Sequence, residues 1–304
     1  NSIASGGNYN VLVGDEAGTA LTTGDNNVAI GFEALKTEDA HGNNVALGYQ
    51  ALKTQNAGAD AYNVAIGSGA GTGITTGVAN VLVGGLAGDV ITTASRNIAI
   101  GLNALGSNIL GSHSIAIGDA ALDAQNYSSA TDAYNVAIGS SAGSAVTTGV
   151  QNALIGGLAG DALTTGGANV AVGYLALSTE DANSFNTAVG FKALLTQNAS
   201  GNAYNTAVGA NSGQLITTGT ANTLIGGLAG DALTTGSNNV ALGISALTTD
   251  DVGSRSVAIG SNALESQNTA SAANVYNVAV GYAAGAAVTT GTKNTFIGAL
   301  AGDA

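Results

Sequence analysis

The chain has 304 residues, of which 47 are Gly, and it contains no Pro, Cys, Met or Trp. Its 6 basic residues stand against 19 acidic ones, so the net charge is −13. These values exclude a basic nucleic-acid surface, a disulfide framework and a thiolate metal site, and no apolar run reaches the ~18 residues of a membrane span. An apolar content of 45% also argues against disorder.

A short repeat covers the whole chain. Its unit reads Asn-Val-Ala-Ile-Gly-x-x-Ala, and each unit predicts a strand of about five residues that ends at the glycine, because the apolar run is β-branched and bounded by turn residues. In chain order the anchor glycines are Gly14, Gly31, Gly48, Gly67, Gly84, Gly101, Gly118, Gly139, Gly156, Gly173, Gly190, Gly209, Gly226, Gly243, Gly260, Gly281 and Gly298.

The spacing of these glycines predicts the architecture. The step from one anchor glycine to the next is seventeen in most units and nineteen or twenty-one in every fourth, which gives regular four-unit blocks. One strand and its turns cannot bury an apolar face alone, so the units must stack. We therefore expect residues 1–304 to form a single all-β domain, a parallel β-solenoid of about 17 coils of 17–21 residues.

A polar position lies four residues before each anchor glycine. In-register Asn side chains there can hydrogen-bond from coil to coil and satisfy groups at a buried turn. Ser114 and Ser256 replace Asn in two units. The expected ladder residues are Asn27, Asn44, Asn63, Asn80, Asn97, Asn135, Asn152, Asn169, Asn186, Asn205, Asn222 and Asn239.

A second regularity concerns side-chain volume. Four residues after the anchor glycine the chain has Leu or Gly. After Leu, the residue three further on is polar, as in Leu35/Glu38 and Leu194/Gln197; after Gly it is aliphatic, as in Gly71/Ile74. We infer that each coil places one large aliphatic group in the same interior space by one of two routes, as close packing demands.

The strand alternates Asn, Ala and Gly on one side with the branched pair on the other. Either set can line the interior. The favoured interpretation leaves the branched pair outside, where it forms an aliphatic stripe and an oligomer interface; the alternative buries that pair in a self-sufficient monomer. The candidate interface residues are Val28, Ile30, Val45, Leu47, Val64, Ile66, Val136, Ile138, Val257 and Ile259.

The units at 114–122, 256–264 and 27–35 resemble the Asn-Ser-Val-Ala-Ile-Gly repeats of YadA-like trimeric autotransporter adhesin heads. The longer unit, with Gly-Tyr-x-Ala-Leu and a downstream Thr-Thr-Gly, is similar to repeats of phage and bacterial tail fibres. The resemblance covers the full chain and implies a left-handed β-roll, a homotrimer and a surface fibre used in attachment. The coils are longer than the adhesin unit, and the sequence shows neither the membrane anchor nor the chaperone segment of those families.

Candidate chemistry is sparse. Gly139-Ser140-Ser141-Ala142-Gly143 matches a nucleophile elbow, but sister coils place Gly or Ala in the same slot, so the repeat explains it. His41 and His113 lie in different coils, and we expect solvated turns without companion ligands.

Acidic groups carry little chemistry either. One carboxylate per site near Asp89, Asp161 and Asp231 cannot supply the six or more oxygens of a calcium site. We expect the acidic pairs 38–39, 180–181 and 250–251 to be solubility and edge-protection charges.

Two further features mark the turns. Thr-Thr pairs begin at residues 22, 75, 92, 147, 164, 217, 234 and 289; a regular Thr array can order water as ice-binding solenoids do, whereas hydroxyls that bond the backbone are the favoured role. Long coils end at Tyr62, Tyr134, Tyr204 and Tyr276, which could face a glycan but are expected to pack on their own inserts.

Together these observations predict a structural extracellular, cell-surface or virion fibre or adhesin shaft, with ice binding as the alternative function. We expect no enzyme activity, no cofactor and no metal. The expected partners are further copies of the chain, as a homotrimer or an end-to-end filament, and a surface glycan or host receptor. Neither end has a polar cap, which favours a piece of a longer fibre or end-to-end stacking.

Overall fold

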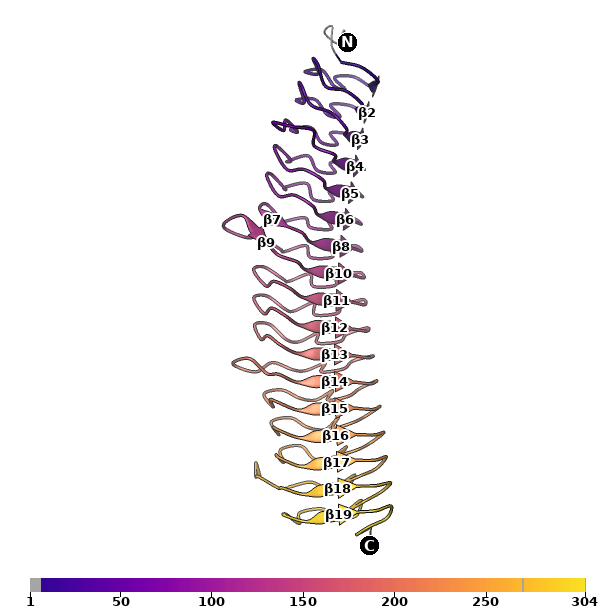
Figure 1. The fold of residues 1–304 in the computed structure, drawn as a ribbon, viewed down its shortest axis with the longest axis vertical. Coiled ribbons are helices and arrows are strands. Elements are labelled where there is room, and N and C mark those ends of the chain that lie inside the picture. The colour runs from indigo at the N-terminus through magenta and orange to yellow at the C-terminus, as the bar shows by residue number, and fades with distance from the viewer. Residues whose placement is uncertain (1–6, 270, 304) are drawn as a thin grey trace. The chain divides into compact units, whose positions relative to one another are not determined.

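A computed structural model of the chain describes residues 7–269 and 271–303, and within them it contains strands and turns and no helix. The structure divides into two compact units, residues 1–151 and 152–304. In each unit the strands form a parallel ladder in chain order (Figure 1). The predicted fold class, an all-β parallel solenoid of about 17 coils, is confirmed.

The first unit contains one ladder and one small pair of strands. The ladder consists of β1 (Val11–Val13), β2 (Val28–Ile30), β3 (Val45–Leu47), β4 (Val64–Ile66), β5 (Val81–Val83), β6 (Ile98–Ile100), β8 (Ile115–Ile117) and β10 (Val136–Ile138). In the loops before β8 and β10, β7 (Gly111–Ser112) pairs in parallel with β9 (Thr131–Asp132). Figure 1 shows this pair on the loop side, away from the ladder.

The second unit contains the remaining coils. Its ladder consists of β11 (Ala153–Ile155), β12 (Val170–Val172), β13 (Thr187–Val189), β14 (Thr206–Val208), β15 (Thr223–Ile225), β16 (Val240–Leu242), β17 (Val257–Ile259), β18 (Val278–Val280) and β19 (Thr295–Ile297). Each ladder strand has only three residues, so turns make up most of the wall.

Strand register is constant through each unit. Val45 pairs with Val64 across a coil that carries an insert, and Ile115 pairs with Val136 across a coil whose insert is longer. The same positions pair across the shorter coils, as Val28 does with Val45. The extra residues therefore project from the loop side and do not shift the ladder.

The turns explain why the chain closes in so few residues. The N–H of Ala34 donates to the carbonyl of Gly31, and the residue between them at the third turn position, Glu33, has φ of 54°. That is a type II β-turn, which needs a left-handed residue at this position. Leu35 follows with φ of 49°. Left-handed non-glycine residues cost about 1 kcal/mol or more each, so stacking must impose them.

The anchor glycines form a column in each unit. All have φ between 120° and 143°, a conformation that side chains rarely adopt. A Cβ on Gly14 would lie 2.7 Å from the carbonyl oxygen of Gly31, and one on Gly243 would lie 2.6 Å from that of Gly260. Only glycine permits this approach of successive backbones.

The interior is narrow and built from small residues. The central strand residue is fully buried, as at Ala29 and Ala188, whereas the flanking Val and Ile are only partly covered. The Asn, Ala and Gly set therefore faces inward. This is the orientation in which the branched pair lies outside.

The compensation between Leu and Gly coils is visible in the packing. A Cβ on Gly71 would lie 3.2 Å from the Cδ1 atom of Ile74 and 3.0 Å from a methyl of Leu52 in the preceding coil. The expectation of one large aliphatic group per coil is wrong for every fourth coil. There Leu82 replaces the central Ala and is buried together with Ile91, and it fills the space beside both Gly71 and Gly88.

Candidate functional site

The ladder residues are interior side chains. Each of Asn27, Asn44, Asn63, Asn80, Asn97 and Asn135 in the first unit, and of Asn152, Asn169, Asn186, Asn205, Asn222 and Asn239 in the second, is at most 1% exposed. The oxygen of Asn63 accepts from the backbone N–H of Asn80 at 2.8 Å, and its amide donates to the carbonyl of Gly77 at 2.8 Å. The coil-to-coil bond thus joins a side chain to the next backbone.

The candidate interface residues lie on one exposed side of each ladder. Leu47, Ile66 and Ile138 are 41%, 36% and 37% exposed, and Val28, Ile30, Val45, Val64, Val136, Val257 and Ile259 are partly exposed. In the second unit, Thr187, Thr206 and Thr223 replace Val in register. We call the first and third residues of all ladder strands in a unit its outward strand face.

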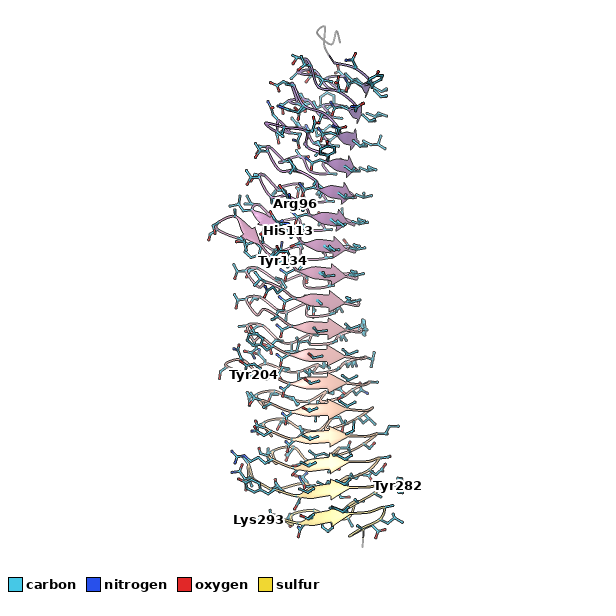
Figure 2. All side chains as sticks on the ribbon, in the orientation of Figure 1. Arg96, His113, Tyr134, Tyr204, Tyr282 and Lys293 are labelled. Carbon is cyan, nitrogen blue, oxygen red and sulfur yellow. The ribbon has the colours of Figure 1, made fainter. Side chains whose placement is uncertain are left out.

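Planar side chains line the loop side. Figure 2 shows Arg96, His113 and Tyr134 there in successive coils. The ring of Tyr134 stacks on His113 of the preceding coil, with centroids 5.1 Å apart, and Tyr204 stacks on Phe185 at 5.3 Å. Tyr134 and Tyr204 remain 52% and 58% exposed. The rings therefore pack between coils, where packing on their own inserts was expected.

The seventh residue after the anchor glycine, which we call the interior slot, is buried in both kinds of coil, except that Val288 is partly exposed. The polar residues that occupy it are Glu38, Gln55, Asn108, Gln125, Glu180, Gln197, Asp250 and Gln267, all 0% exposed. The expectation that Glu38, Glu180 and Asp250 are surface charges is wrong. Burial raises the pKa of all three carboxyls. The pairing of Leu with a polar residue and of Gly with an aliphatic residue could have predicted this burial, because the aliphatic residue in the same slot of other coils points inward.

The acids in the slot have hydrogen-bond partners in the turn that follows, whereas the glutamines accept hydrogen bonds from ladder asparagines. Asn183 donates to both oxygens of Glu180, each at 3.0 Å, through its backbone N–H and its amide. Asp250 accepts from the N–H of Gly253 at 2.9 Å and from Gln267 at 2.6 Å. These bonds offset part of the desolvation cost of the buried carboxylates, whose pKa nevertheless stays raised.

Glu38 differs from the other two acids. Its Oε1 atom accepts from the N–H of His41 at 3.1 Å, but its Oε2 atom has no hydrogen-bond partner, and neither does the buried Nδ1 atom of His41. Ligand atoms of Glu38, Asp39 and His41 lie within 4.8 Å of one another. His41 therefore lies beside two carboxyl groups, a proximity that the sequence analysis did not predict. Among residues 7–269 and 271–303, this is the one such group of three or more.

The remaining acidic and hydroxyl motifs have local roles. Asp161 accepts from the hydroxyl of Ser178 at 2.6 Å, and Asp231 accepts from that of Thr248. Ser141 occupies the left-handed turn position, φ 55°, that Glu33 occupies in its own coil. His113 pairs with Asp132 at 3.0 Å.

The threonine pairs bond to the backbone of the neighbouring coil. The hydroxyl of Thr22 donates to the carbonyl of Asp39, that of Thr75 to Thr92, and that of Thr217 to Thr234. The first hydroxyl of these pairs is therefore occupied by coil-to-coil bonding.

The chain shows no significant match to a family model, to a curated protein or to a solved structure. Within the described ranges 7–269 and 271–303, no helix has the length and hydropathy needed to cross a bilayer.

Proposed function

We propose that this chain is a structural shaft of an extracellular or virion fibre, that it does no catalysis, and that its copies associate as a homotrimer through the outward strand face. The observation that carries the proposal is the side of the ladder on which the branched residues lie. Leu47, Ile66 and Ile138 face solvent while alanines fill the interior.

The area of this face supports association. In the first unit most coils leave about a third of an Ile or Leu and part of a Val uncovered, and the coils stack in register, so this unit presents an aliphatic row on the order of 600 Å². That is at the upper end of patches on soluble monomers. It approaches the ~800 Å² that each partner contributes to a stable interface.

The occupied threonine hydroxyls favour this role over ice binding. Because Thr75 and Thr217 donate to the backbone of the next coil, they contribute to stacking strength rather than to a free hydroxyl array. The ladder asparagines add a second line of coil-to-coil bonds. Both sets of bonds stiffen the stack of coils, which suits a structural shaft.

Native mass measurement tests the proposal, with the triple variant Ile66→Lys, Ile100→Lys and Ile138→Lys. Three ammonium groups on the outward strand face cannot be buried together without large desolvation penalties. We expect the wild type to have three times the chain mass at micromolar concentration and the variant to have the mass of one chain, with an unchanged circular dichroism spectrum.

The matched control places the same three charges on the loop side, in Tyr62→Lys, Ala79→Lys and Tyr134→Lys. Lys293 occupies the equivalent left-handed position naturally, with φ of 59°, so this backbone accepts Lys. The control should keep the wild-type mass. A wild-type monomer, or a trimer that survives lysines on the outward strand face, would refute the proposed assembly.

A further inference from the structure

We propose that Glu38, Asp39 and His41 bind a divalent transition-metal ion of the Zn²⁺ class at the turn that follows their interior slot. Two observations carry this inference independently. Three ligand atoms of the right chemistry converge within 4.8 Å, and a fully buried carboxylate among them has an oxygen without a partner.

The distances fit a shared ion. The Nδ1 atom of His41 lies 3.6 Å from the Oε1 atom of Glu38, too far for a good hydrogen bond. Two ligands at about 2.1 Å from a tetrahedral Zn²⁺ are separated by about 3.4 Å. A small closure of the turn therefore brings both atoms into coordination range, and Asp39 with water completes the shell.

The backbones that carry the ligands are already fixed. The hydroxyl of Thr22 in the preceding coil donates to the carbonyl of Asp39 at 2.8 Å, and the amide of Asn27 donates to the carbonyl of His41 at 3.1 Å. Binding therefore requires little ordering of the chain, which favours affinity.

A sister coil in the second unit provides the internal comparison. The sequence Glu38-Asp39-Ala40-His41 recurs as Glu180-Asp181-Ala182-Asn183, and only the last residue differs. Asn183 satisfies both oxygens of Glu180. His41 replaces that amide with an imidazole whose Nδ1 atom can accept a metal but leaves Glu38 Oε2 unpartnered. With His in place of Asn, the turn lacks the side-chain amide that donates a hydrogen bond to the carboxylate and has an imidazole nitrogen that can coordinate a metal.

The ligand set selects the metal. Imidazole suits Zn²⁺, Cu²⁺ and Ni²⁺, whereas Mg²⁺ and Ca²⁺ prefer sites made only of oxygen. A ligand set of one nitrogen and two carboxylates is thus expected to retain Zn²⁺ in preference to Ca²⁺.

Isothermal titration calorimetry tests the proposal. The full chain is treated with EDTA, the chelator is removed, and the protein is titrated with ZnCl₂. We expect one equivalent bound to the wild type and none to His41→Asn, whose turn then matches residues 180–183. The reciprocal variant Asn183→His should bind two equivalents. Because loss of a supporting residue alone weakens metal sites about 10- to 100-fold, loss of the imidazole should weaken binding by at least about 100-fold.

Circular dichroism confirms that each variant keeps its fold, and the visible spectrum of bound Co²⁺ reports the coordination. In the competing arrangement Glu38 closes on Gln55, whose Nε2 atom is also unpartnered, as Asp250 does on Gln267. In that case zinc does not bind to the wild type and the proposal is wrong. Zinc binding that His41→Asn leaves unchanged, or a single equivalent in Asn183→His, would equally overturn the assignment to this turn.

Discussion

The coil that carries Leu194 and the next coil, which carries Gly213, fill their interiors in opposite ways. In the first, Leu194 points inward and the slot holds Gln197; in the second, Gly213 leaves room and the slot holds Ile216. A Cβ on Gly213 would lie 3.0 Å from a methyl of Leu194 and 3.1 Å from one of Ile216. The two aliphatic side chains therefore bound the same space.

The difference shows that the coil conserves volume rather than residue identity at each position. Leu194 has φ of 49° and Gly213 has φ of 58°, so the backbone is left-handed at this position in both coils. What changes is the polarity of the slot. Once Leu supplies the volume, the slot accepts a polar residue, and that residue must then find hydrogen bonds inside the coil.

The largest expected effect comes from a feature that both coils share, the glycine column. Gly243→Ala places a Cβ 2.6 Å from the backbone of Gly260 at φ of 136°. We expect a loss of about 3 kcal/mol or more in the free energy of unfolding, measured by urea denaturation. Gly201→Ala is the control, because nothing lies within 4 Å of its Cβ. It should change stability by less than about 0.5 kcal/mol.

The exchange of one coil type for the other tests the comparison directly. Leu194→Gly alone opens a cavity and should cost about 3–5 kcal/mol, and Gln197→Ile alone overpacks the coil by about 1–3 kcal/mol. The double variant reproduces the Gly213/Ile216 arrangement. Its loss should be smaller than the sum of the single losses by at least about 1 kcal/mol. Additive losses would show that the two positions do not share one space.

The smallest expected effect concerns the charge in the slot. Burial raises the pKa of Glu180 in the folded chain, so the folded state holds its proton more firmly than the unfolded state. The stability that protonation provides is present at pH values below the unfolded pKa and is lost as the pH rises through the raised one. Glu180→Gln removes this titration.

Thermal unfolding between pH 4 and pH 8 measures the effect of Glu180→Gln. The melting temperature of the wild type should fall relative to that of the variant as the pH rises through the raised pKa of Glu180. Parallel curves for the two proteins would mean that the hydrogen bonds from Asn183 fully offset the desolvation of the carboxylate.

Much of the fold is predictable from sequence because the repeat averages out local ambiguity. The glycine spacing predicts the strands and their parallel stacking, and the pairing of Leu35 with Glu38 or Gly71 with Ile74 predicts the shared interior volume. The burial of Glu38 was not predicted, because a charged residue type favours an exposed side chain whereas its position in the repeat is the one that aliphatic residues occupy in other coils.

The cluster of Glu38, Asp39 and His41 and the stacked rings were not predicted for a different reason. The proximity of His41 to Glu38 depends on how tightly one turn closes, and that geometry leaves no periodic trace. The stack of Tyr204 on Phe185 depends in turn on the path of an insert. Both are properties of a single coil, whereas sequence patterns report what many coils share.

The constant register across coils of unequal length has a practical consequence. The extra residues of the longer coils emerge on the loop side, and Thr187 still pairs with Thr206 and Val257 with Val278. Changes in the length of this loop therefore leave the strand pairing unchanged. A foreign peptide grafted between Asn198 and Asn202 would be displayed without perturbing its scaffold. Grafts in every fourth coil of one unit would stand about 19 Å apart, four strand spacings.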